Sequence, residues 1–66
     1  MTEGDFTSLL PIMVEDTVSW ARSPDDAIYK CVWLLAENRL SHEQFIRLLV
    51  AVEADTPWTL TVPTFH

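Results

Sequence analysis

Apolar residues recur at helical spacing in three successive segments, which predict α-helices over residues 8–22, 24–38 and 42–54. The segment before the first helix, residues 1–7, is polar and acidic and predicts an arm. Pro11 supports this boundary, because proline is tolerated in the first turn of a helix but not in its interior. The pattern therefore predicts an all-α fold, a small domain of three helices.

The second helix has a clear start and a wide apolar surface. Ser23 is placed to cap its first turn, and Pro24 occupies the first helical position. Asp26, Lys30 and Glu37 form a narrow polar strip, so two helices of the same chain cannot cover all the rest. We expect a homodimer whose interface consists of four residues of this helix: Tyr29, Val32, Trp33 and Ala36. The alternative for the two aromatic residues is packing against the first helix or the tail.

The link between the second and third helices carries several local signals. Asn38 is expected to adopt the left-handed conformation that ends a helix. Ser41 and Gln44 have the spacing of a capping box, and Leu40 and Phe45 have that of a hydrophobic staple. The two helices are thus expected to form an αα-hairpin. Ion pairs are expected between oppositely charged residues four positions apart on the helices, Asp26 with Lys30 and Glu43 with Arg47.

The C-terminal segment, residues 56–66, changes to a period of two. Trp58, Leu60 and Val62 alternate with threonines, and Phe65 follows, which predicts an extended tail. Three arrangements of these apolar side chains remain open. They pack as a lid over the three helices, they exchange between the subunits of a dimer, or they bind another protein.

Two acidic residues just before the tail break a local rule. Glu53 and Asp55 lie at the end of the third helix, where the helix dipole disfavours negative charge. We interpret them as an acidic lip that meets a basic surface of a partner, with ordinary solvated charge as the alternative. The expected partner-binding residues are then Glu53, Asp55, Trp58, Leu60, Val62 and Phe65.

Composition and charge narrow the classes of partner. A chain of 66 residues forms one domain at most, and a single cysteine excludes an intrachain disulfide. We therefore expect association with another chain to stabilise the small core. Four basic and ten acidic residues give a net charge of −6, so direct nucleic-acid binding is not expected. A DNA mimic is the inverse alternative, although the charge density is below that of duplex DNA.

No residue pattern indicates catalysis. Cys31 lies in the middle of an apolar helix, where a buried thiol is inert. His42 and His66 have no partner at the spacing of a metal site, and Gly4 is the only glycine, so no phosphate-binding loop is present. We expect no enzymatic activity, no cofactor, no metal and no small-molecule substrate.

These observations favour a small acidic protein that binds another protein and inhibits or modulates it. In size and charge alone it is similar to the small acidic proteins with which phages and mobile elements inhibit host proteins, and this likeness implies inhibition. The alternatives are a structural or adaptor subunit of a larger assembly and a DNA mimic that inhibits a nucleic-acid-binding protein. The sequence shows neither a signal-peptide pattern nor a membrane-spanning apolar run, so we expect a cytoplasmic protein with no membrane association.

Overall fold

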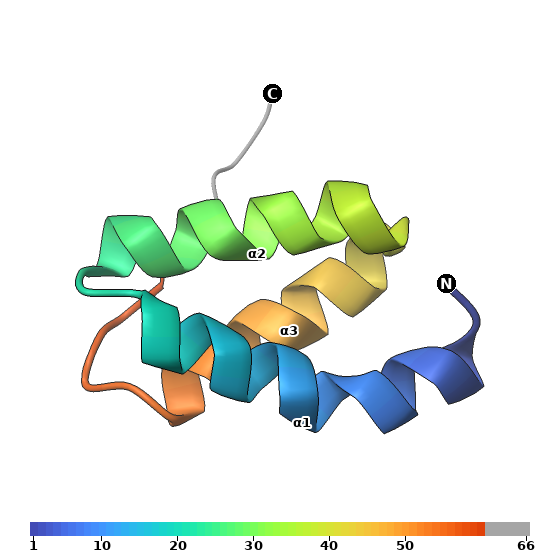
Figure 1. Cartoon of the computed structure of the whole chain (residues 1–66), viewed down its shortest axis with the longest axis horizontal. Helices are drawn as coiled ribbons and strands as arrows, with labels where there is room; N and C mark the ends of the chain where they lie inside the picture. Colours follow the sequence, from blue (N-terminus) through green and yellow to red (C-terminus); the bar gives the residue numbers. More distant parts are fainter. Residues whose placement is uncertain (61–66) are drawn as a thin grey trace.

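The computed structural model describes residues 1–60, and these residues form three helices that all pack against one another (Figure 1). The helices are α1 (Glu3–Trp20), α2 (Pro24–Asn38) and α3 (His42–Ala54). In Figure 1, α1 and α3 both run from right to left and α2 runs from left to right. The predicted all-α fold is confirmed. The ranges of α2 and α3 agree with the predicted ones, whereas α1 begins and ends earlier than residues 8–22.

The prediction of an N-terminal arm over residues 1–7 is wrong, because most of that segment belongs to α1. The Thr2 side chain caps the first turn, and the helix continues through Pro11. Phe6 is fully buried in the core. Burying a phenylalanine side chain stabilises the fold by roughly 1.5–3 kcal/mol, which helps to offset the backbone hydrogen bond that Pro11 cannot donate.

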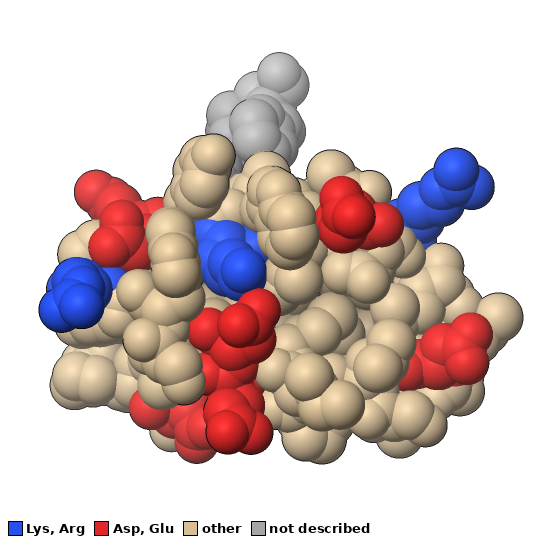
Figure 2. Space-filling view, in the orientation of Figure 1, with Lys and Arg blue, Asp and Glu red and all other residues tan. Residues whose placement is uncertain are grey.

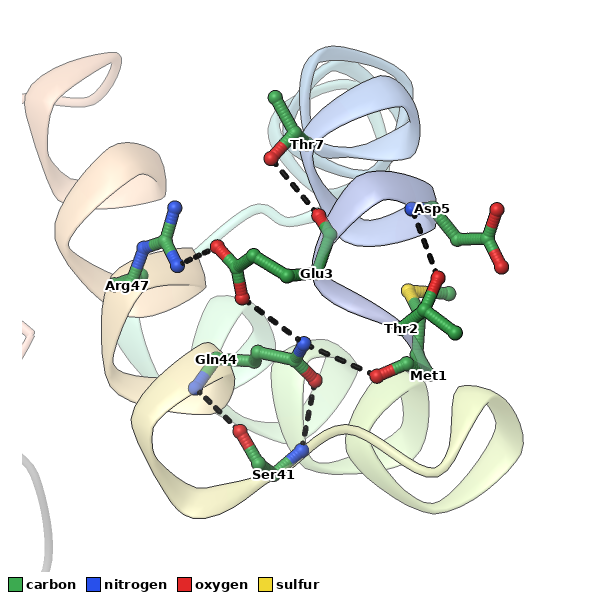
Figure 3. A network of polar contacts seen from close by, with 8 residues as sticks. All are labelled: Met1, Thr2, Glu3, Asp5, Thr7, Ser41, Gln44 and Arg47. Carbon is green, nitrogen blue, oxygen red and sulfur yellow. Dashed lines mark hydrogen bonds and ion pairs between the residues drawn. The ribbon is translucent and has the colours of Figure 1, made fainter.

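A network of polar contacts holds the start of α1 against α3 (Figure 3). Gln44 is buried, and its side-chain nitrogen donates to the carbonyl of Met1 at 3.2 Å and to the carboxylate of Glu3 at 3.4 Å. Arg47 donates to the other carboxylate oxygen of Glu3, so it does not pair with the acid four residues before it, as the sequence predicted. Hydrogen bonds from Arg47 and then from Gln44 hold the pKa of Glu3 below its ordinary value of 4.5.

The αα-hairpin closes as predicted, except at one residue. The serine caps of α2 and α3 and the capping box are confirmed. The left-handed residue is Arg39, with φ 52°, and the prediction that Asn38 takes this conformation is wrong. Asn38 stays helical, and its side chain donates to the carbonyl of Leu34 at 3.1 Å. The amide of Leu40 donates to the carbonyl of Leu35 at 3.0 Å, which completes a Schellman-type helix end.

The core lies between the three helices. Its largest fully buried side chains, by decreasing volume, are Phe6, Leu48, Leu49, Val52, Thr17 and Cys31. The Thr17 hydroxyl donates to the carbonyl of Met13 at 2.8 Å. Within residues 1–60, no buried side-chain nitrogen or oxygen lacks a hydrogen-bond partner. The prediction that Cys31 is a core residue is confirmed, and burial raises the pKa of its thiol to about 11.

Candidate functional site

Three aromatic side chains and a lysine form a surface that we call the aromatic patch: Trp20, Tyr29, Lys30 and Trp33. The rings of Trp20 and Tyr29 stack, with centroids 6.4 Å apart and an angle of 27° between their planes. The Lys30 ammonium lies 4.6 Å from the centroid of the Trp33 ring and 5.8 Å from that of Trp20. The end of α1 and the middle of α2 together therefore position the patch.

The aromatic patch lies on the outside of the three-helix domain. Tyr29 is 67% exposed, Trp20 48% and Trp33 47%, and the neighbouring Val32 is 46% exposed. Ala36, the last of the four predicted interface residues, is also exposed. Tyr29 does touch α1 through Trp20, but most of its surface stays free. The structure thus places all four predicted interface residues on the surface of α2.

The charge of Lys30 is neutralised within the patch. Its ammonium pairs with Asp16 of α1 at 3.2 Å, and its side chain is only 18% exposed. The predicted pair with Asp26 is wrong, because Asp26 instead accepts the backbone amide of Arg22 at 3.1 Å and so fixes the turn between α1 and α2. A covered, paired cation between two indole rings leaves a surface that presents mainly aromatic carbon.

The two residues of the acidic lip predicted at the end of α3 have different surroundings. Glu53 is half-buried and turned inward, and its carboxylate accepts the amide of Leu60 at 2.7 Å. This contact explains why a negative charge is tolerated near the end of the helix. Asp55 caps α3 and is exposed. Of the two acids, Asp55 is therefore the more exposed.

The first part of the tail packs on its own domain. Leu60 is buried, Trp58 is half-buried and Thr59 between them is exposed, so the predicted alternation is present over these three residues. The prediction that Leu60 is free to bind a partner is wrong, because its side chain is part of the core. The predicted partner-binding residues Val62 and Phe65 lie outside the described residues.

A second surface feature is a groove between α1 and the end of α3, with a volume of about 540 Å³. Its apolar lining consists of Leu10, Pro11, Val14, Val18 and Ala51. Two carboxylates, those of Glu15 and Asp55, lie at its edges. We call this feature the α1–α3 groove.

Sequence reasoning missed two members of these surfaces, Trp20 and Glu15. The three-residue connection between α1 and α2 brings Trp20 near Tyr29, because residues close to a short helix–helix connection lie near one another. No local signal marks Glu15, since its role depends on how α3 crosses α1.

On the face seen in Figure 2, one group of touching acidic side chains runs from the centre to the lower edge, and other acidic side chains lie apart from it. Two of the acids, Glu3 and Asp16, are paired with basic residues. Among residues 1–60, no group of three or more potential ligands could hold a metal ion. None of the helices described is both long and apolar enough to cross a membrane.

Comparison with known proteins adds no functional information: no protein family, no curated protein and no solved structure matches the chain.

Proposed function

We propose that this protein is a small, non-enzymatic protein that acts as a homodimer, binds another protein and inhibits or modulates it. The observation that carries the proposal is the aromatic patch, which is exposed although the core beneath it is complete. A contiguous aromatic surface on a small domain is typical of a protein interface, because tyrosine and tryptophan provide most binding energy per residue.

The aromatic patch suits a second copy of the same chain. An interface of standard size buries about 800 Å² on each partner, which is a large part of the 4517 Å² surface of this domain. Such an interface needs most of one helix face, and α2 offers one with Tyr29, Val32, Trp33 and Ala36 exposed along it. In a twofold dimer the same residues face each other, so the apolar surfaces match without further adaptation.

The closed core of the single domain supports regulation of a partner rather than a permanent structural role. Its core is closed and its described buried polar atoms are paired, which supports a protein that folds before it meets a target. An obligate subunit is expected to have part of its core supplied by its neighbours. The single cysteine, a buried thiol, fits the reducing cytoplasm, where we place this activity.

The DNA-mimic alternative has less support. A mimic needs a long array of unpaired negative charge, whereas Glu3 and Asp16 are paired with basic residues.

The proposal is tested with the native host. The immobilised protein captures proteins from an extract, each enriched protein is purified, and its direct affinity for the protein and its own activity are measured. A partner that binds at micromolar concentration or below, and whose activity changes in the complex, supports the proposal. A stable complex with unchanged partner activity shows an adaptor instead, and the absence of any direct binder contradicts the proposal.

A further inference from the structure

The α1–α3 groove has the form of a binding site for a helix. Leu10, Val14 and Val18 are four residues apart and therefore form one continuous row along α1, about 12 Å long. Ala51 of α3 is small and keeps the groove open on its other side. A row of apolar side chains beside a shallow hollow accepts the side-chain ridge of another helix. The length corresponds to about two turns of that helix.

The groove also carries two acidic residues. Glu15 and Asp55 lie at its edges, and the two ion pairs found within residues 1–60 involve neither of them. Because α1 and α3 run in the same direction, their C-terminal ends lie at the same end of the groove (Figure 1). Neither helix has a basic residue in its last turn, so the partial negative charge of their carbonyl groups is not balanced there.

We propose that the α1–α3 groove binds a basic amphipathic helix of the partner protein. This inference rests on the proposed function and names the class of partner segment. Apolar residues of that helix, spaced three or four apart, occupy the row of Leu10, Val14 and Val18. Lysine or arginine residues on its flanks meet Glu15 and Asp55. The net charge of −6 steers such a segment toward the domain and repels nucleic acid and anionic lipid.

The groove leaves the aromatic patch free, so the two surfaces serve different contacts. No residue lining the groove belongs to the aromatic patch or to the four predicted dimer residues. A dimer formed through α2 therefore presents two grooves, one on each subunit.

A synthetic peptide serves as the probe. It has about 18 residues, leucines three and four apart on one face, and lysine and arginine on the flanks of that face. A second peptide has the same composition in an order that breaks the amphipathic pattern. Binding is measured by titration calorimetry, and amide chemical shifts of the full-length protein locate the site. The proposal predicts shifts confined to the groove segments of α1 and α3, and binding at least about tenfold tighter than that of the scrambled peptide.

Two charge-matched variants test the role of the carboxylates. Glu15→Gln with Asp55→Asn removes both charges of the groove, whereas Glu37→Gln with Asp25→Asn removes two exposed charges from α2. Circular dichroism first confirms that both proteins are folded. We expect the groove variant to bind the amphipathic peptide at least about fivefold more weakly and the α2 variant to bind it within about twofold of the unchanged protein. Added salt should reduce the difference.

Other outcomes contradict the inference. Equal binding of the two peptides, equal weakening by the two variants, shifts centred on the aromatic patch, or no binding each shows that the groove is not this site. Amide chemical shifts of groove residues that change with protein concentration in the absence of peptide show that a second copy of the chain occupies the groove. If the peptide fails but a captured partner binds and changes activity, the groove is wrong and the proposed function stands. If the peptide binds but no partner is found, only the proposed function fails.

Discussion

At the scale of single residues, charged side chains of this chain contact distant segments more often than the next turn of their own helix. Lys30 pairs with α1, Arg47 pairs with the start of α1, and Glu53 accepts an amide of the tail. For Lys30 and Arg47, the spacing along the sequence instead predicted ion pairs with acidic residues four positions earlier on the same helix. Exposed pairs of that kind gain only about 0.3–0.5 kcal/mol, so tertiary alternatives displace them easily. This is why the pairing of charges could not be predicted from the sequence.

The acidic side chain of Glu3 gives a pH-dependent contribution to stability. Its pKa in the folded protein lies below the ordinary value of 4.5, because Arg47 and then Gln44 donate hydrogen bonds to it. The contribution is therefore fully present above the unfolded-state pKa and is lost as the pH falls through the folded-state pKa. We expect Glu3→Gln to lower the urea midpoint at neutral pH, and the difference from the unchanged protein to shrink in acid. A difference that is constant from neutral pH to acid would contradict the Glu3 contacts.

The buried thiol gives a second prediction at this scale. Cys31 is fully buried, and the pKa of its thiol is raised to about 11, so at mildly alkaline pH the thiol is neutral and inaccessible. Ellman's reagent should label the native protein only at the rate of unfolding, and should label it at once in guanidinium chloride. The stability that the neutral thiol contributes is present below pH 9.0 and is lost as the pH rises through about 11. Rapid labelling of the native protein would show that this part of α2 is open.

At the scale of the elements, the sequence predicts what local chemistry determines. The starts of α2 and α3, the capping box and the hairpin agree with the structure, because each depends on residues within one turn of one another. The start of α1 does not, because burial of Phe6 between distant segments outweighs the local signal of Pro11. The left-handed residue that ends α2 is Arg39, one position after the predicted Asn38. A difference of one residue is the usual uncertainty of helix boundaries.

The first two turns of α1 are therefore expected to be essential to the fold. Phe6→Ala should lower the free energy of unfolding by about 3–5 kcal/mol, since it removes a fully buried ring and leaves a cavity. Leu9→Ala is the control, because Leu9 lies on the same helix and is 37% exposed, and its loss should cost much less. Urea denaturation followed by circular dichroism measures both. Equal small effects would mean that residues 1–7 form an arm after all.

At the scale of the whole molecule, the sequence predicted which residues of α2 are exposed but not how the surfaces are assembled. The excess of apolar residues on that helix marked Tyr29, Val32 and Trp33, because a chain this small cannot cover them all. The contribution of Trp20 and the α1–α3 groove required the packing of α1 on its neighbours. Of the predicted partner-binding residues that fall within residues 1–60, only Asp55 lines this groove.

The central claim is that a second copy of the chain covers the aromatic patch in solution, and sedimentation equilibrium tests it most directly. We expect a dimer at micromolar concentration for the unchanged protein and for Val50→Asp, a control on α3 at a residue that is 63% exposed. Trp33→Asp should sediment as a monomer with an unchanged circular dichroism spectrum, because an unpaired charge in an apolar interface costs several kcal/mol. A monomer at high concentration for the unchanged protein, or a dimer that tolerates Trp33→Asp, would contradict the claim.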